Sequence, residues 1–280
     1  MIVCIGNGES RKDFDLTKLN NFFTIGCNAL YRDFTPNILV CMDYKLCHEV
    51  YRSGYAFKNI CYFKEWEKIK EKSYKNLFVE GHYKQFVGVV KNLDGLVDEF
   101  SWPKEKKKFF VCWANNKDLM EKFKEEKQKE DSTLTDDDFK LHCDMKTVGY
   151  TITWTKKKDK IQSLKKYDTR TNAGAISLLL ATEHKITKEE IYLLGHDIYS
   201  DTNTVNNLYK DTNGYVGKNA KAIDPKNWIR HYAVLFKKWH DTKFIIVNTK
   251  KTDEWKDIEN INYITYEQFN DTLNLNHFKG

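Results

Sequence analysis

Three short apolar runs in the first 43 residues are the feature that most limits the fold of this chain. They are followed directly by Gly6-Asn7-Gly8, by Asn28 and by Asp43, and short helical segments separate them. Short, continuous apolar runs are typical of strands buried on both faces of a parallel sheet. The carboxyl ends of such strands share one edge, where open α/β sheets bind their ligands. The sequence therefore predicts an α/β protein with a Rossmann-like, mostly parallel sheet flanked by helices.

The remaining expected elements continue this alternation. Strands are expected at residues 1–5, 22–27, 37–42, 59–63, 190–194 and 243–247, and helices at 15–19, 29–34, 44–51, 171–184 and 225–240. A last short strand and helix are expected before residue 280.

Domain organisation follows from where this alternation stops. Residues 1–72 and 168–280 are expected to form a nucleotide-binding α/β core. Residues 73–167 are expected to be a large insertion or a substrate-facing subdomain. Within the insertion, residues 109–113 and 148–154 are strand-like, and the charged stretch 117–138 is either a solvated helix or a mobile loop.

Gly6 and Gly8, one residue apart after the first run, indicate an anion-binding loop. Glycines allow a sharp turn and leave backbone N–H groups open to a close ligand. The loop is no dinucleotide fingerprint, because Arg11 stands where a third glycine or alanine is required. The alternative is an ordinary tight turn after an edge strand. Asn28 and Asp43 carry a similar alternative, since such residues often only cap the following helix.

A second candidate phosphate site lies at the start of the helix expected at residues 171–184. Thr171 is expected to be its N-cap, and small residues follow. The bare N–H groups and the dipole at a helix start favour a phosphate, to which Arg170 can add a bidentate contact. The next strand ends in Gly195-His196-Asp197, which again places a glycine and an acid at a carboxyl end.

Composition limits the class of protein more than its activity. The net charge of +6 mildly favours anionic partners. The seven cysteines are scattered, and Cys4, Cys27, Cys41 and Cys61 fall in expected strands, as reduced core thiols do. No run approaches the ~18 apolar residues of a membrane span, and no signal peptide is recognisable. A cytoplasmic protein without a membrane span is expected.

Five motifs in order carry a resemblance to a known family. They are Gly6-Asn-Gly-x-Ser10, Cys27-Asn28, the segment 36–43, the segment 170–174 and the segment 191–199. Together they resemble the bacterial sialyltransferases that use CMP-activated sialic acid. The wider relatives are motility-accessory glycosyltransferases and 6-hydroxymethylpterin pyrophosphokinase-like proteins. The resemblance implies a GT-A-like sialyltransferase variant of the Rossmann-like fold, and it covers residues 1–63 and 168–250.

The resemblance also implies which residues form the site. The implied donor-nucleotide residues are Gly6, Asn7, Gly8, Ser10, Asn28, Asp43, Thr171, Asn172, Ala173, Gly195, Asp197 and Tyr209. Arg170 and Tyr199 would stabilise the departing phosphate.

Two departures from the family pattern affect the chemistry. Asp43 replaces an asparagine and, with Asp197, admits a divalent metal if the donor is a diphosphate. Gly214 stands where the family has a catalytic histidine before Tyr215. His196 and His231 are the candidate replacements as general base, although a histidine beside an aspartate is often only a structural pair.

The leading hypothesis is a glycosyltransferase that moves a sugar from a nucleotide-sugar donor to a hydroxyl acceptor. A CMP-sugar donor needs no cofactor, whereas a nucleoside diphosphate sugar would call for Mg or Mn. The acceptor is open between a glycan, a protein and a modified DNA base. The alternatives are an ATP-dependent pyrophosphokinase of a small alcohol and a non-catalytic nucleotide-binding module.

Overall fold

The computed structural model divides the chain into two units, residues 1–66 with 159–280 and residues 67–158. It describes residues 1–64, 66, 100–101, 108–109, 125, 128–129, 131–133, 159–167, 171–184 and 190–277. In the second unit, the described residues include one antiparallel pair, β5 (Phe100–Ser101) with β6 (Lys108–Phe109). The other strand-like pieces and the charged stretch of the predicted insertion lie almost wholly outside the described residues.

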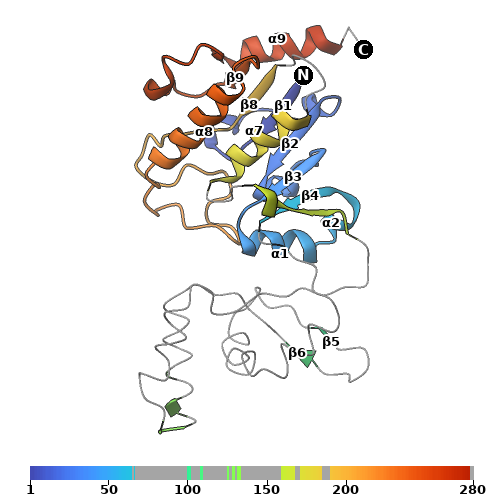
Figure 1. Ribbon diagram of the computed structural model, residues 1–280, viewed down its shortest axis with the longest axis vertical. Coiled ribbons are helices and arrows are strands. Elements are labelled where there is room, and N and C mark those ends of the chain that lie inside the picture. The colour runs from blue at the N-terminus through green and yellow to red at the C-terminus, as the bar shows by residue number, and fades with distance from the viewer. Residues whose placement is uncertain are drawn as a thin grey trace. The chain divides into compact units, whose positions relative to one another are not determined.

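The first unit is built on an eight-stranded sheet of order β10-β9-β8-β1-β2-β3-β4-β7, and every pairing in it is parallel. The prediction of a Rossmann-like parallel sheet flanked by helices is thus confirmed (Figure 1). The strands are β1 (Ile2–Ile5), β2 (Phe23–Cys27), β3 (Ile38–Cys41), β4 (Ile60–Phe63), β7 (Ile161–Ser163), β8 (Ile191–Leu194), β9 (Phe244–Val247) and β10 (Ile261–Ile264).

Helices cover both faces of this sheet. The longer ones are α1 (Tyr44–Arg52), α7 (Ala173–His184), α8 (Lys226–Lys238) and α9 (Tyr266–His277), with the short α2 (Tyr55–Lys58) after α1. Single 3-10 turns complete the connections: η1 (Glu9–Arg11), η2 (Leu16–Leu19), η3 (Asn28–Arg32), η4 (Leu164–Lys166) and η5 (Asp253–Trp255).

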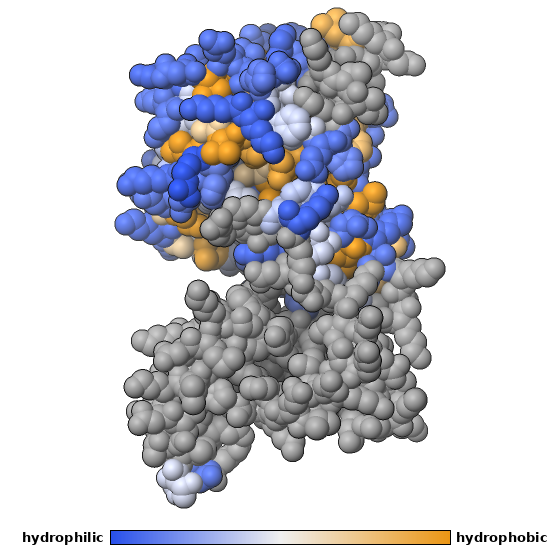
Figure 2. All heavy atoms as spheres, viewed as in Figure 1, coloured by the Kyte–Doolittle hydropathy of each residue, from blue (hydrophilic) through white to orange (hydrophobic). Residues whose placement is uncertain are grey.

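The core lies in two layers, one on each face of the sheet. Along β1, Ile2 and Cys4 pack into the layer beneath α7 and α8, while Val3 and Ile5 pack into the layer with α1 and α9. All four side chains are at most 2% exposed. Burial on both faces explains why the strands read as unbroken apolar runs and not as alternating ones. Figure 2 shows mostly hydrophilic residues on the visible surface of this unit, with smaller hydrophobic areas between them.

The order of the strands reverses between β1 and β8. From β1 the chain proceeds outward through β2, β3 and β4, and it later returns to place β8 on the other side of β1. The chain therefore continues from β1 and from β8 toward opposite edges of the sheet. In open α/β sheets this reversal is where a crevice forms and ligands bind.

Three details refine the expectations. β7, whose residues were assigned to the insertion, pairs with β4 as the edge strand of the main sheet. The cysteines of the described strands are buried and free, as expected for reduced core thiols. Within the described part of the chain, no helix combines the length and the apolar character needed to cross a membrane.

Candidate functional site

The loop after β1 lies directly against the loop after β8. The Gly6 N–H donates to the Leu194 carbonyl at 2.8 Å, and the Gly8 N–H donates to the Gly195 carbonyl at 2.9 Å. A Cβ on Gly6 would lie 2.2 Å from the Gly195 oxygen, a distance that side chains do not reach. Gly195 itself has a φ of +70°, in the left-handed region that favours glycine. Both glycines are thus required by backbone packing at the strand reversal.

Asp197 holds the second half of the glycine loop, which is the loop of residues 6–10 that follows β1. Its carboxylate accepts from the Ser10 N–H at 2.8 Å and from the Ser10 hydroxyl, which is a very short contact. A Cβ on Gly8 would lie 2.3 Å from the Asp197 Cγ, so the absence of a side chain lets the carboxylate reach the loop. Burial raises the pKa of Asp197 above its usual value, and the bonds from Ser10 act in the opposite direction.

Asn7 and Asn28 line the same crevice from β1 and β2. The Asn7 Nδ2 donates to the Cys27 carbonyl and to the Tyr215 hydroxyl, both at 3.1 Å. Its Oδ1 is buried and has no hydrogen-bond partner among the described residues. Asn28 has a φ of +50°, and its Oδ1 accepts from the Met42 N–H at 3.1 Å. Asn28 therefore ties the ends of β2 and β3 together instead of only capping the segment that follows it.

The start of α7 meets the crevice from the third side. Asn172, and not Thr171, is the N-cap: its Oδ1 accepts from the Ala175 N–H at 2.8 Å, and its carbonyl accepts from Ile176. The expectation for Thr171 is wrong by one residue, because the first helical turn begins at Ala173. A Cβ on Gly174 would lie 2.1 Å from the Tyr232 hydroxyl, so α7 and α8 approach closely here.

His196 is buried between these elements. Its Nδ1 lies 2.7 Å from the Tyr232 hydroxyl, while the buried Nε2 has no hydrogen-bond partner within the described part of the chain. Burial lowers the pKa of His196 to about 4, so the ring is neutral at pH 7. A neutral, enclosed imidazole with its Nδ1 held by a tyrosine is a structural pair and a poor general base at neutral pH.

Two cavities open at this edge of the sheet. The smaller, of about 140 Å³, is lined by the glycine loop, Asn28, the start of α7 and the segment 195–198. Trp228 and Tyr232, one turn apart on α8, also line it. In the sequence, Trp228 is one of the apolar residues of the helix expected at residues 225–240. The i, i+4 spacing of two aromatic residues was the available signal, but it does not distinguish a cavity wall from core.

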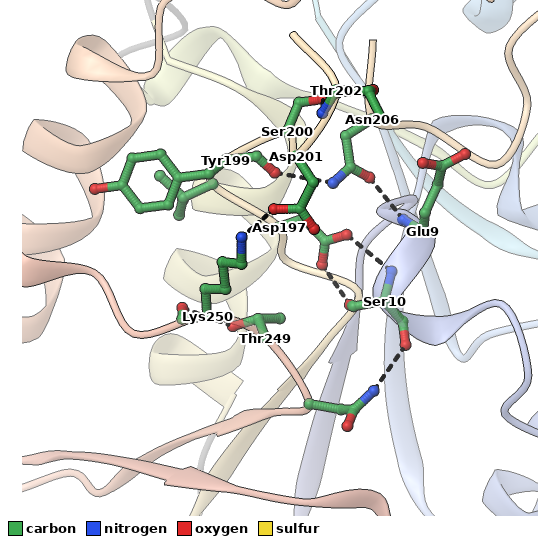
Figure 3. A pocket seen from close by; sticks show the side chains of 12 residues that line it. Glu9, Ser10, Asp197, Tyr199, Ser200, Asp201, Thr202, Asn206, Thr249 and Lys250 are labelled. Atoms are coloured by element: carbon green, nitrogen blue, oxygen red, sulfur yellow. Dashed lines mark hydrogen bonds and ion pairs between the residues drawn. The ribbon is translucent and has the colours of Figure 1, made fainter. Parts of the chain in front are cut away.

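The larger cavity, of about 320 Å³, shares Asp197 with the smaller one, and Figure 3 shows the side chains that line it. Ser10, Asn206 and Lys250 are among its lining residues and come from three separate segments. Asn206 links two of its walls, because it accepts from the Glu9 N–H at 2.8 Å and donates to the Tyr199 carbonyl at 2.9 Å. Asp197, Ile198 and Asn206 line both cavities.

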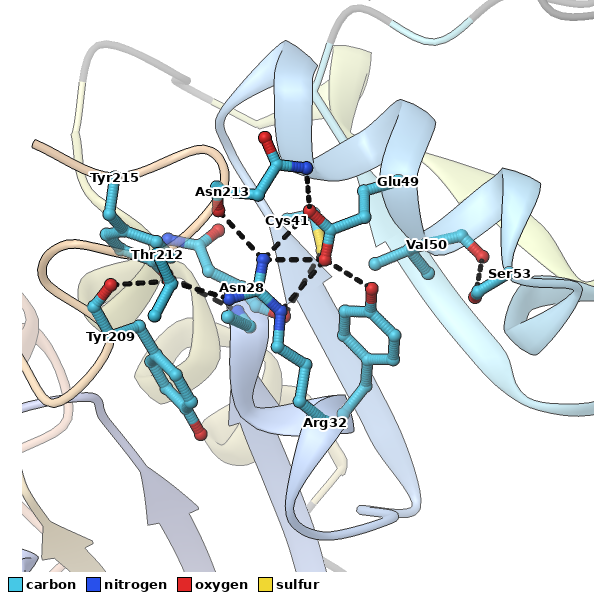
Figure 4. A network of polar contacts seen from close by, with 12 residues as sticks. Asn28, Arg32, Cys41, Glu49, Val50, Ser53, Tyr209, Thr212, Asn213 and Tyr215 are labelled. Atoms are coloured by element: carbon cyan, nitrogen blue, oxygen red, sulfur yellow. Dashed lines mark hydrogen bonds and ion pairs between the residues drawn. The ribbon is translucent and has the colours of Figure 1, made fainter. Parts of the chain in front are cut away.

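Arg32 and Glu49 hold the loop that carries Tyr215 (Figure 4). Their ion pair is 2.6 Å long, and the two side chains are about one-fifth exposed. Arg32 also donates to the Thr212 hydroxyl at 2.7 Å and to the Asn213 carbonyl at 2.8 Å. This network joins the loop to η3 and α1, and so it sets where the Tyr215 hydroxyl meets Asn7.

Several predicted residues do not line either of these two cavities. Asp43 caps α1, because its carboxylate accepts from the Lys45 N–H at 2.9 Å. The buried Tyr209 donates to the Asp33 carboxylate at 2.6 Å and accepts from Arg11 at 3.0 Å. His231 is half-buried on α8.

Of the two residues with an implied role in leaving-group stabilisation, only Tyr199 is among the described residues. Tyr199 lines the larger cavity, and its hydroxyl donates to Glu254 at 2.7 Å. Arg170 lies outside the described residues, so its role stays a prediction.

Gly214, at the position of the family histidine, has a φ of +81°, and a Cβ there would lie 3.0 Å from Leu46. A histidine at this position would therefore be strained.

The described residues contain no cluster of side chains that would support the predicted metal site. No group of three or more histidine, cysteine, aspartate or glutamate side chains able to hold a metal occurs there. Asp43 is engaged as a helix cap, and both oxygens of Asp197 accept hydrogen bonds from Ser10. These two carboxylates, as arranged, do not fit a metal site.

Comparisons with known protein families, with curated proteins and with solved structures find no significant match to this chain. The class that the fold defines is an α/β protein with a Rossmann-like parallel sheet.

Proposed function

We propose that this protein is a nucleotide-sugar-dependent glycosyltransferase whose donor nucleotide binds in the smaller cavity. One observation carries the proposal: four segments distant in sequence meet around this cavity at the reversal of strand order. They are the loop 6–8, Asn28, the start of α7 and the loop 195–198. A crevice of this kind is the usual ligand site of an open parallel sheet.

The start of α7 supports binding of the donor phosphate. Asn172 caps the Ala175 N–H of the first turn, and the helix dipole favours an anion at this end of the helix. Ala173 and Gly174 of this turn line the cavity, and neither carries a side chain larger than a methyl group. The volume of about 140 Å³ is below the range of whole-ligand sites, so we expect it to enclose only one part of the nucleotide.

Asn7 and Trp228 support binding of the nucleoside. The unpaired, buried Asn7 Oδ1 would accept from a ribose hydroxyl or a base amino group. The Trp228 ring offers a surface on which a base can stack, a contact worth roughly 1–3 kcal/mol.

Asp197 is the proposed general base, because it is the carboxylate that lines both cavities. In the transfer step the acceptor hydroxyl loses its proton to Asp197 and its oxygen bonds to the anomeric carbon. The bond from that carbon to the phosphate oxygen breaks, and its electron pair leaves with the nucleotide. The hydrogen bonds from Ser10 hold the carboxylate in place for this role.

A thermal-shift panel with CMP, CDP, UDP, GDP and ATP, each with and without manganese, tests the binding site. We expect at least one nucleotide to raise the melting temperature, because a ligand of the native state stabilises it by mass action. The Trp228→Ala variant is expected to weaken that nucleotide about tenfold or more, through loss of stacking. Val234→Ala, on the exposed side of the same helix, is the matched control and should leave binding unchanged.

The panel also separates the alternatives. A shift with CMP alone and without metal favours a CMP-sugar donor, and a manganese-dependent shift with UDP or GDP favours a diphosphate donor. A shift with ATP alone favours the pyrophosphokinase alternative. Absence of every shift would contradict the nucleotide site.

Substitution of Asp197 by asparagine tests the chemical step. We expect release of the nucleotide from its sugar donor to fall about 10²–10⁴-fold, as for loss of a general base. The asparagine side chain in this variant keeps one oxygen that can accept from the Ser10 N–H. The loop should therefore stay in place, and the nucleotide should still raise the melting temperature. Asp241→Asn, at an exposed position, is the control. If nucleotide binding and release decline together in D197N, the role of Asp197 is structural and the assignment as base is wrong.

A further inference from the structure

The larger cavity has a lining suited to a different ligand from the smaller one. Eleven of its twelve lining residues carry a polar side-chain atom, the exception being Ile198. These residues carry carboxylates, amides, hydroxyls and one ammonium group, so the lining offers both hydrogen-bond donors and acceptors. Its volume of about 320 Å³ is within the range of small-ligand sites.

Two of the hydroxyl groups, those of Ser200 and Thr249, are only weakly engaged within the protein. The Ser200 hydroxyl lies 3.4 Å from the Thr202 hydroxyl, which has a closer partner in Thr204 at 2.7 Å, and the Thr249 hydroxyl donates to the Lys250 carbonyl at 3.3 Å. The distances of 3.4 Å and 3.3 Å exceed the 2.5–3.0 Å of good hydroxyl hydrogen bonds. Such groups can exchange their present contacts for a ligand at little cost.

The charge of the cavity disfavours a phosphate. Three carboxylates line it (Glu9, Asp197 and Asp201), against the single ammonium group of Lys250. That ammonium group already forms a close ion pair with Asp201. Lys210 compensates Glu9 at 2.5 Å without lining the cavity, which leaves Asp197 uncompensated. An anionic ligand would meet net negative charge, whereas a neutral ligand rich in hydroxyls would find many acceptors.

The two cavities share Asp197, Ile198 and Asn206 as a common wall. We propose that the larger cavity binds a neutral saccharide, which presents the accepting hydroxyl of the transfer reaction at this wall. The inference rests on the proposed function, in that the donor must occupy the smaller cavity. It identifies the acceptor as an uncharged carbohydrate, in preference to an anionic glycan or a nucleic acid.

Saturation-transfer NMR on the full chain tests this inference. The neutral probes are maltose, lactose and N,N′-diacetylchitobiose, and the anionic probes are glucose 6-phosphate and glucuronic acid. We expect at least one neutral probe to receive saturation and the anionic probes to receive several-fold less. Thr249→Trp, which fills the larger cavity alone, should reduce the neutral signal at least fivefold.

Two controls keep the test independent of folding and of the nucleotide site. Lys251→Trp places the same side chain at the neighbouring exposed residue, which does not line the cavity, and should keep the signal. Thr202→Trp fills the cavity from its other wall and replaces T249W if that variant does not fold. Nucleotide thermal shifts should be unchanged in every folded variant.

The outcomes separate this inference from the proposed function. No signal from any neutral probe, with the nucleotide shift intact, overturns the saccharide site alone. A neutral signal that survives both cavity-filling variants, or equally strong binding of the anionic probes, also overturns it. Loss of every nucleotide shift in the unmodified protein overturns the proposed function, whatever the saccharides do.

Discussion

Replacing Gly6 by alanine is expected to destabilise the protein by about 3 kcal/mol and to abolish nucleotide binding. The added Cβ would lie 2.2 Å from the Gly195 oxygen and 2.9 Å from its carbonyl carbon. Both are backbone atoms of the loop after β8, and neither can move without breaking the parallel contact of β1 with β8. Urea unfolding measures the change in stability, and the thermal-shift panel measures the change in binding.

Gly217→Ala is the matched control for this substitution. A Cβ on Gly217 would lie 3.4 Å from the nearest atom, the Asp211 Oδ1, which is an ordinary contact. We expect its effect on stability to be within about 0.5 kcal/mol. If G6A is as stable as G217A and still binds nucleotide, the close approach of the two loops does not define the site.

Acidification from pH 6.5 to pH 4 is expected to reduce the free energy of unfolding through His196 by about 3 kcal/mol. Burial lowers the pKa of His196 from 6.5 to about 4 in the folded protein. Between these values the unfolded chain binds a proton that the native protein does not, so stability falls as pH falls. About one pH unit below the folded pKa both states bind the proton, and His196 then causes no further loss.

Urea unfolding of the His196→Asn variant at several pH values isolates this contribution. The Asn side chain can still bond to the Tyr232 hydroxyl but does not titrate, so we expect a shallower loss of stability between pH 6.5 and pH 4. His240→Gln is the control, because His240 is 79% exposed and its substitution should leave the pH dependence unchanged. Equal slopes for the H196N variant and the unmodified protein would show that His196 is not buried in its neutral form.

The apolar runs were sufficient to predict the sheet because their burial needs no long-range information. Continuous runs such as residues 2–5 and 244–247 fit only strands covered on both faces. The short β7 was assigned to the insertion, because a three-residue strand at an edge has almost no apolar pattern. The N-cap of α7 was predicted one residue early, since Thr171 and Asn172 are both good caps and only the hydrogen bonds distinguish them.

The candidate site was predictable where backbone packing dictates the residue. Gly6, Gly8 and Gly195 follow strands at the reversal of strand order, and each is required by a close approach or by a positive φ. Side-chain direction was not predictable in the same way. Tyr209 is buried against Arg11 and bonds to the exposed Asp33, although its position in the loop allowed a ligand contact equally well.

The sequence by itself determined the parallel sheet, its buried strands and the edge at which polar residues gather, because hydrophobic burial and glycine conformation are local requirements. The tertiary structure alone decided that Asp197 is shared by two cavities, that His196 is enclosed by Tyr232, and that Trp228 faces the crevice. These relations join residues more than thirty positions apart or set the direction of one side chain. They depend on how strands and helices pack, and no local pattern encodes that.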